Sequence, residues 1–368
     1  MNYKFFTSES VAAGHPDKIA DAISDAILDA ILKQDPTART GLETIVGANK
    51  IGLFGEVKTT AKVDFEAIAR QKIKQLGYDN PDWHFSDKSP LDNNIHKQSP
   101  EIAMGVDLDG AGDQGMMFGF ACNETPELMP LPIVLAHALT RTLDEKRESG
   151  EITFLRPDGK SQVTVEYDGD TPKAIEKVVM AVAHDEAVDP EEVRKVVKKQ
   201  IIDEVMNKYG YEVSDDQVVI NGTGLWHVPG PDTDAGLTGR KIVVDGYGGY
   251  ARVGGGAFSG KDPSKVDRSA AYAARYIAKN VVAAGLADRC EVALAYCIGV
   301  ADPMMKTFET FGTEKKPLSE IQEFIDELLD TSVKGIVEGL SLRQPIYSST
   351  VAYGHFGDKD LPWEKVQN

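Results

Sequence analysis

Residues 254–268 read GGGAFSGKDPSKVDR, and no other stretch of the chain is as informative. Glycines have no Cβ, so the backbone N–H groups of such a run can approach phosphate oxygens closely. The stretch leads into a predicted helix with Asp262 as N-cap and Pro263 at its first position, which ends near Gly285. The N-terminus of a helix adds unpaired amides and a positive dipole end. The pattern predicts a polyphosphate site.

Two simpler interpretations stay open at this point. Gly255, Gly260 and Lys261 match the P-loop spacing, but Asp262 stands where that motif needs Ser or Thr for magnesium. A triple glycine also occurs in ordinary loops at strand ends, with the lysine as a solvated charge. The local charge favours an anion site, because residues 239–275 hold seven Lys or Arg and three acids in a chain of net charge −18.

Length and composition exclude several classes of protein. A chain of 368 residues with 42% hydrophobic residues can bury two or three cores. The acidic balance argues against a nucleic-acid partner. Met1 to Ser10 hold no signal-peptide core, and no apolar run reaches membrane-spanning length. Cys122, Cys290 and Cys297 are odd in number and lack C-x-x-C spacing. We therefore expect a soluble, cytoplasmic protein with no membrane partner.

Helical and strand-like segments alternate irregularly, which favours an α+β fold with mixed or antiparallel sheets. Helices are predicted at residues 16–33, 64–76, 130–146, 190–209, 313–330 and 334–342. Strands are predicted at residues 42–46, 51–57, 116–121, 161–167 and 292–300. We expect a loop at 79–100, strands and tight turns at 218–253, and an irregular tail with exposed aromatic side chains after Pro345.

The first predicted helix carries two rows of side chains at four-residue spacing. One row is apolar and predicts the buried face: Ile19, Ile23, Ile27 and Ile31. The other is acidic: Asp17, Asp21, Asp25 and Asp29. We interpret the last three aspartates as a solvated face. Asp17 differs, because it lies in the first turn beside His15 and Lys18.

Several motifs occur together in an order and spacing typical of one enzyme family. They are Gly14-His15-Pro16-Asp17-Lys18, Gly112-Asp113-Gln114-Gly115, Gly236-Leu237-Thr238-Gly239-Arg240-Lys241, the stretch at 254–268, and Tyr353-Gly354-His355-Phe356-Gly357. Each motif alone is weak. Together they cover nearly the whole chain, which resembles S-adenosylmethionine synthetase (methionine adenosyltransferase) of the bacterial and eukaryotic type.

The resemblance implies that ATP and L-methionine give S-adenosylmethionine, and that the triphosphate leaves whole and is then split to phosphate and diphosphate. It implies two magnesium ions and a potassium ion, and a homodimer or homotetramer with active sites at the dimer interface. It also implies three similar α/β-layered domains, near 1–100, 101–230 and 231–368, related by a pseudo-threefold axis. A thioether sulfur carries no proton, so this reaction needs alignment and charge stabilisation rather than a general base.

The resemblance also assigns residues. The catalytic set is His15, Asp113, Lys160, Arg240, Lys241, Lys261 and Lys265. The ATP-binding set is His15, Asp158, Lys160, Leu225, Trp226, Asp234, Arg240, Lys241, Ala257 and Lys261. The methionine-binding set is Glu56, Gln98, Asp234 and Lys265. Asp17 and Asp267 match magnesium ligands, for which carboxylates suit a hard ion, and Glu43 matches the potassium ligand. Taken alone, most of these acids would be surface charges, and His15 would be a helix-terminal histidine bonded to backbone.

The chain departs from the family pattern at a few places. Leu225-Trp226 stands where most relatives have Arg-Phe, and Trp226 would still stack on adenine. Thr233 and Gly246 replace a usual glycine and threonine, and the segment from Gln98 to Gly110, a mobile loop in relatives, is shorter here. Two other functions stay open: an ATP-binding homologue without turnover, and a metal-dependent polyphosphate hydrolase or kinase. Methionine-dependent release of phosphate and diphosphate would distinguish them.

Overall fold

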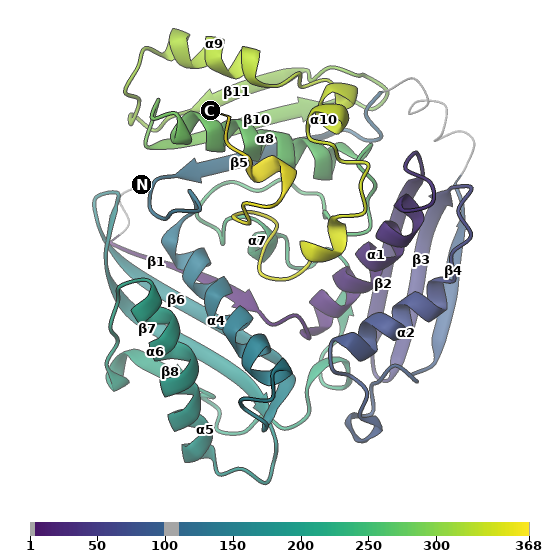
Figure 1. Ribbon diagram of the computed structural model, residues 1–368, viewed down its shortest axis with the longest axis vertical. Coiled ribbons are helices and arrows are strands. Elements are labelled where there is room, and N and C mark those ends of the chain that lie inside the picture. The colour runs from purple at the N-terminus through teal and green to yellow at the C-terminus, as the bar shows by residue number, and fades with distance from the viewer. Residues whose placement is uncertain (1–3, 99–109, 368) are drawn as a thin grey trace.

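The computed structural model describes residues 4–98 and 110–367, so most of the segment from Gln98 to Gly110 lies outside the described residues. It contains three β-sheets, each packed against one long helix (Figure 1). These helices are α1 (Pro16–Leu32), α4 (Leu131–Glu148) and α8 (Val266–Ala283). Two sheets are mixed and one is antiparallel, which confirms the α+β class. No helix in the described ranges is long and apolar enough to cross a bilayer.

The three sheets share one plan. In each, a lone strand pairs antiparallel with the first strand of a hairpin, and in two of them a parallel fourth strand follows. The sheet on α4 has β1 (Phe5–Val11), β6 (Leu155–Asp168), β7 (Thr171–His184) and β8 (Val218–Ile220). The sheet on α8 has β5 (Gly115–Cys122), β10 (Arg289–Tyr296) and β11 (Met305–Glu309). The sheet on α1 has β9 (Gly236–Leu237), β2 (Arg39–Gly47), β3 (Lys50–Lys58) and β4 (Leu91–Lys97).

The lone strands exchange between the three units in a cycle. Strand β1 precedes α1 but pairs in the sheet on α4, β5 precedes α4 but pairs in the sheet on α8, and β9 precedes α8 but pairs in the sheet on α1. Such a cyclic exchange is consistent with a pseudo-threefold arrangement of the three units. Division of the chain near residues 100 and 230 stays a prediction, and it would leave one strand of every sheet in a neighbouring segment.

The isoleucine row of α1 explains why that helix packs where it does. All four isoleucines are buried against β2 and β3, where they form one hydrophobic cluster with side chains such as Leu42 and Leu53. A second, larger cluster joins the units of α4 and α8. The remaining helices are α2 (Phe65–Gln75), α5 (Pro190–Val197), α6 (Asp203–Lys208), α7 (Ile242–Asp245), α9 (Leu318–Leu328) and α10 (Val333–Gly339), with a π-helical turn between α5 and α6.

Two local predictions were wrong and a third was correct in part. Residues 79–100 hold a strand, β4, which pairs parallel with β3. Residues 218–253 hold turns and two short strands, β8 and β9, as predicted, but also the short α7 and a 3-10 helix at Gly230–Asp232. Helix α8 begins at Val266 because the Asp262 carboxylate accepts the Ser264 N–H at 2.9 Å in a turn of its own. The strands β1, β7 and β11 were not predicted at all.

The C-terminal tail is irregular, as predicted, but its aromatic side chains are buried. Tyr347, Phe356 and Trp363 belong to the larger hydrophobic cluster. Trp363 stacks on Tyr272 of α8 with ring centroids 3.7 Å apart, and its Nε1–H donates to the His355 carbonyl at 2.8 Å. The tail therefore packs across α8 as part of the core (Figure 1).

Candidate active site

The N-terminus of α1 holds the first group of predicted site residues. His15 is the N-cap, and its Nδ1 accepts the Asp17 N–H at 3.2 Å. The Asp17 carboxylate accepts the Leu237 N–H at 3.1 Å and forms an ion pair with Lys241. Gly236 lets β9 lie against this turn, because a Cβ there would be 2.1 Å from the Pro16 carbonyl. The motif at 236–241 is thereby brought to the motif at 14–18.

The charge states in this group follow from burial and from the lysines. Burial, followed by the positive charges of Lys241 and Lys160, lowers the pKa of His15 to about 3. The imidazole is therefore neutral at pH 7, and since Nδ1 accepts a hydrogen bond, Nε2 carries the proton. Burial opposes ionisation of Asp17, but the bonds from Lys241 and the Leu237 N–H bring its pKa below the usual value.

Strand β6 places Asp158 and Lys160 beside this group. Gly14 lies against the strand so closely that a Cβ would be 2.0 Å from the Pro157 carbonyl oxygen. Asp158 is buried and accepts the Gly230 N–H at 3.0 Å, while its other oxygen has no partner within the described residues. Burial raises the pKa of Asp158 to about 7, against the opposing effects of that N–H and of Lys160. The Lys160 side chain is exposed.

The second group lies at the start of α8. Lys261 Nζ is 2.5 Å from Asp267 Oδ2, and Lys265 Nζ is 3.1 Å from Asp262 Oδ2. A Cβ on Gly256 would be 2.2 Å from Asp267 Cγ, so this position must lack a side chain for the loop to lie over that carboxylate. That the glycine run lets backbone N–H groups approach phosphate stays a prediction.

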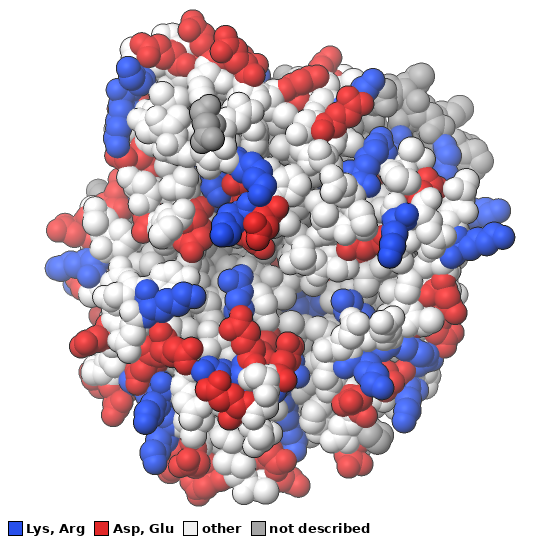
Figure 2. Space-filling model, viewed as in Figure 1, with Lys and Arg blue, Asp and Glu red and all other residues white. Residues whose placement is uncertain are grey.

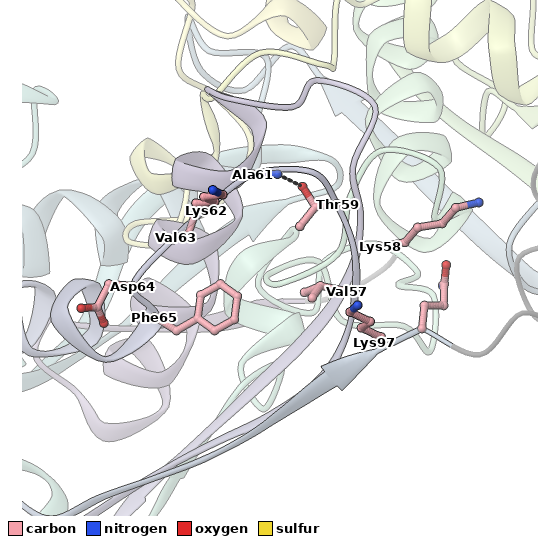
Figure 3. A pocket seen from close by; sticks show the side chains of 10 residues that line it. Val57, Lys58, Thr59, Ala61, Lys62, Val63, Asp64, Phe65 and Lys97 are labelled. Atoms are coloured by element: carbon pink, nitrogen blue, oxygen red, sulfur yellow. Dashed lines mark hydrogen bonds between the residues drawn. The ribbon is translucent and has the colours of Figure 1, made fainter.

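Three of the four predicted methionine-binding residues lie in or next to this second group: Lys265, Glu56 and Gln98. Lys261 bridges Gly41 on β2, and Gly41 stands opposite Glu56 in the β2–β3 ladder. Gln98 Nε2 donates to Glu56 Oε1 at 3.0 Å. Gln98 also lines a cavity of about 960 Å³ at the ends of β3 and β4, into which Val57 and Phe65 project (Figure 3).

Two backbone hydrogen bonds join other predicted residues to the first group: Arg240 N–H donates to the Leu237 carbonyl (3.4 Å) and Asp234 N–H to the Gly230 carbonyl (3.3 Å). No side-chain hydrogen bond or ion pair within the described ranges joins the remaining predicted residues to either group. They are Glu43, Asp113, Leu225, Trp226, Asp234, Arg240 and Ala257, all exposed or half-buried. The Trp226 indole donates to the Val228 carbonyl at 3.0 Å, so its ring is held in one orientation. Glu43 is on the outer face of β2, opposite Phe54.

The aspartate row of α1, which we define as Asp17, Asp21, Asp25 and Asp29, contradicts the sequence prediction. Asp21 and Asp25 are fully buried and Asp29 is partly buried. Their carboxylates accept backbone N–H groups of distant segments. The contacts are Gly239 N–H to Asp21 (2.8 Å), Gly260 N–H to Asp25 (2.8 Å), and Tyr347 and Ser348 N–H to Asp29 (3.0 and 2.7 Å). These donors offset the repulsion that like charges four residues apart have on a helix.

Magnesium suits the two carboxylates that the resemblance assigns to it. Within the described residues, no group of three or more His, Cys, Asp and Glu could hold a metal ion. Asp17 and Asp267 are instead single carboxylates, each paired with a lysine. Magnesium commonly takes one or two carboxylates and completes its shell with phosphate oxygens and water. The residues therefore fit a metal that arrives with a polyphosphate.

Comparison with known proteins gives a consistent result over the whole chain. Family models of S-adenosylmethionine synthetase match in succession: the N-terminal domain at residues 3–100, the central domain at 108–226 and the C-terminal domain at 228–365. The chain is 53% identical to the S-adenosylmethionine synthase of Streptococcus suis (strain 05ZYH33), over 99% of this chain and 96% of that protein. It is 51% identical to that of Mycobacterium sp. (strain KMS), with the same coverage. The chain belongs to the S-adenosylmethionine synthetase family.

Proposed function

We propose that the protein joins ATP and L-methionine to S-adenosylmethionine and then hydrolyses the released triphosphate to phosphate and diphosphate. One observation carries the proposal. Each of the two carboxylates predicted to bind magnesium is paired with a lysine predicted to bind phosphate, Asp17 with Lys241 and Asp267 with Lys261. A magnesium triphosphate needs a carboxylate for its metal ion and a cation for its phosphates. Each of these two pairs provides both.

The chain's own residues supply orientation and charge. Neutral His15 offers Nε2–H as a donor to the oxygen that leaves the ATP 5′ carbon. No hydrogen bond joins this nitrogen to another described residue. Lys160, Arg240, Lys241, Lys261 and Lys265 take up the negative charge that grows on the leaving triphosphate. When bound, magnesium held by Asp17 and Asp267 would neutralise phosphate oxygens.

The methionine and adenosine parts of the substrates fall to the other predicted residues. Glu56, Gln98, Asp234 and Lys265 would hold the amino acid group, with the sulfur directed at the 5′ carbon. Asp158, Leu225, Trp226, Asp234 and Ala257 would hold the nucleoside, and Glu43 would bind potassium. Asp113 would stabilise the sulfonium by its negative charge.

We also propose that two copies of the chain complete each site. The cavity that Asp267 lines inside the chain holds only about 10 Å³, so a triphosphate must lie on the outer surface of the second group. Ile45 and Phe54 lie on the outer faces of β2 and β3 and are 45% and 40% exposed, which gives an apolar surface beside Glu43. A homodimer or homotetramer that covers this surface would enclose the site.

We further propose a cytoplasmic location without nucleic-acid or membrane partners. Cys122 and Cys290 are buried and unpaired, and burial raises the pKa of both thiols. On the face in Figure 2, acidic and basic side chains are mixed and form no broad basic area.

The experiment is one assay on the purified chain with ATP, magnesium and potassium, with and without methionine. We expect S-adenosylmethionine, phosphate and diphosphate in equal amounts, only when methionine is present. Removal of magnesium should abolish all three products. ATP hydrolysis without methionine would instead show a hydrolase, and ATP binding without any product would show a silent homologue.

A further inference from the structure

The aspartate row lies along the segment that runs from strand β9 into Arg240 and Lys241. Four residues of α-helix advance by about 6 Å, so successive carboxylates of the row can reach different amides of one passing segment. Asp17 and Asp21 are four apart on α1, and they accept the N–H groups of Leu237 and Gly239, which are two apart along the chain (3.1 and 2.8 Å). Successive carboxylates thus meet alternate amides of the segment that runs directly into Arg240 and Lys241.

Asp25, the next carboxylate of the row, is hydrogen-bonded to the loop that carries Lys261. Asp25 accepts the Gly260 N–H at 2.8 Å, one residue before Lys261. Its two oxygens also accept Nη1–H and Nη2–H of Arg268 at 2.8 and 2.7 Å, and Arg268 Nη1–H donates to the Lys261 carbonyl at 3.2 Å. The Gly260 N–H before Lys261 and the Lys261 carbonyl are therefore both hydrogen-bonded to the buried Asp25–Arg268 ion pair.

We propose that Asp21 and Asp25 are positioning residues for the phosphate-binding cations. Asp21 fixes the loop of Arg240 and Lys241 through the Gly239 N–H, and Asp25 fixes the loop of Lys261 through the Gly260 N–H and through Arg268. Neither carboxylate lies at the surface where the substrate would bind. The inference depends on the proposed function in one respect: it takes these cations to be the ligands of the triphosphate.

Asp29, in the same aspartate row, provides a control for the effect of losing a buried carboxylate. Asp29 accepts two backbone N–H groups at similar distances (3.0 and 2.7 Å), but they belong to Tyr347 and Ser348 in the tail and lead to no predicted site residue. Loss of Asp29 should therefore cost stability alone. Asp21 is the better test than Asp25, because Lys18 keeps its second partner Asp245 when Asp21 is removed, whereas Arg268 would be left unpaired.

The experiment compares Asp21→Ala with Asp29→Ala in the full chain. The measurements are kcat, the KM values for ATP and methionine, the Kd for inorganic tripolyphosphate by calorimetry, and the melting temperature. We expect Asp21→Ala to raise the KM for ATP and the Kd for tripolyphosphate by about 10-fold or more, the loss typical of a charge-assisted hydrogen bond, with the KM for methionine unchanged. Asp29→Ala should lower the melting temperature and leave both binding constants within about 2-fold.

A matched pair isolates the acceptor if Asp21→Ala does not fold. Lys18→Met combined with Asp21→Asn removes the charge but keeps a carbonyl for the Gly239 N–H, whereas Lys18→Met with Asp21→Leu removes that acceptor as well. The first should bind tripolyphosphate at least about 5-fold more tightly than the second. Equal binding in this pair, or equal effects of Asp21→Ala and Asp29→Ala, would overturn the inference. A wild-type chain that binds tripolyphosphate but makes no S-adenosylmethionine would instead refute the proposed function.

Discussion

Replacement of Gly256 by alanine tests whether the position of the Asp267 carboxylate matters. The new Cβ would be 2.2 Å from Asp267 Cγ and 2.4 Å from Oδ1. Ordinary carbon–carbon contacts lie near 3.5 Å, so the carboxyl group must move by roughly 1.3 Å. Asp267 can do this by rotating its short side chain, which costs the fold little. A displacement of about 1 Å at a reacting centre can nevertheless cost about 100-fold in rate.

We therefore expect Gly256→Ala to lower kcat for S-adenosylmethionine by about 100-fold and to weaken the magnesium dependence, while the melting temperature stays within a few degrees. Gly255→Ala is the matched control. It stiffens the same loop, but a Cβ there meets nothing within 4 Å, so Asp267 stays in place and the loss should be much smaller. Normal turnover in Gly256→Ala, or an equal loss in both variants, would refute the reasoning.

Three further predictions follow from single contacts. Lys265→Ala and Asp267→Asn should each lower the rate at least about 100-fold with an unchanged circular dichroism spectrum, because each removes a charge that the transition state needs. Asp25→Asn should cost about 3–5 kcal/mol in urea unfolding at fixed protein concentration, since it leaves buried Arg268 unpaired, and Asp25→Leu with Arg268→Met should recover most of this. The raised pKa of Asp158 should make the wild-type free energy of unfolding fall as pH rises from about 4 to 7, because in this range the carboxyl ionises only in the unfolded chain. Asp158→Asn should remove this pH dependence. An unchanged pH dependence in the variant would contradict the raised pKa of Asp158.

The sequence predicted the elements whose patterns are local. The isoleucine row of α1 and the apolar run of β5 form the elements expected of them. Strand β7 was missed because its pairing with β6 is long and interrupted by register shifts, which no local pattern shows. The tail was predicted to be exposed because its backbone is irregular, yet Trp363 is fully buried on α8. Burial of irregular backbone depends on distant partners such as the His355 carbonyl, and these appear only in the folded chain.

For the site, the family resemblance predicted a set of residues and their roles but not their contacts. Asp17 pairs with Lys241, and Gln98 donates to Glu56, while the roles of all four stay a prediction. The buried role of Asp21 and Asp25 was missed, because four-residue spacing of a charged residue is equally typical of a solvated face. What distinguishes the two cases is whether donors from elsewhere in the chain reach the carboxylates, and a helical pattern carries no information about those donors.

The lysine–carboxylate pairs also explain how so acidic a chain could accept a triphosphate. Asp17 and Asp267 are largely buried, and each has a lysine as its counter-charge. An anion alone would take the lysine and leave the carboxylate unpaired, and a cation alone would do the reverse, so either would meet the penalty of an uncompensated charge. A ligand that brings both charges at once, such as a triphosphate with its magnesium, can replace both partners without that penalty. The arrangement therefore favours the metal–nucleotide complex over either of its parts.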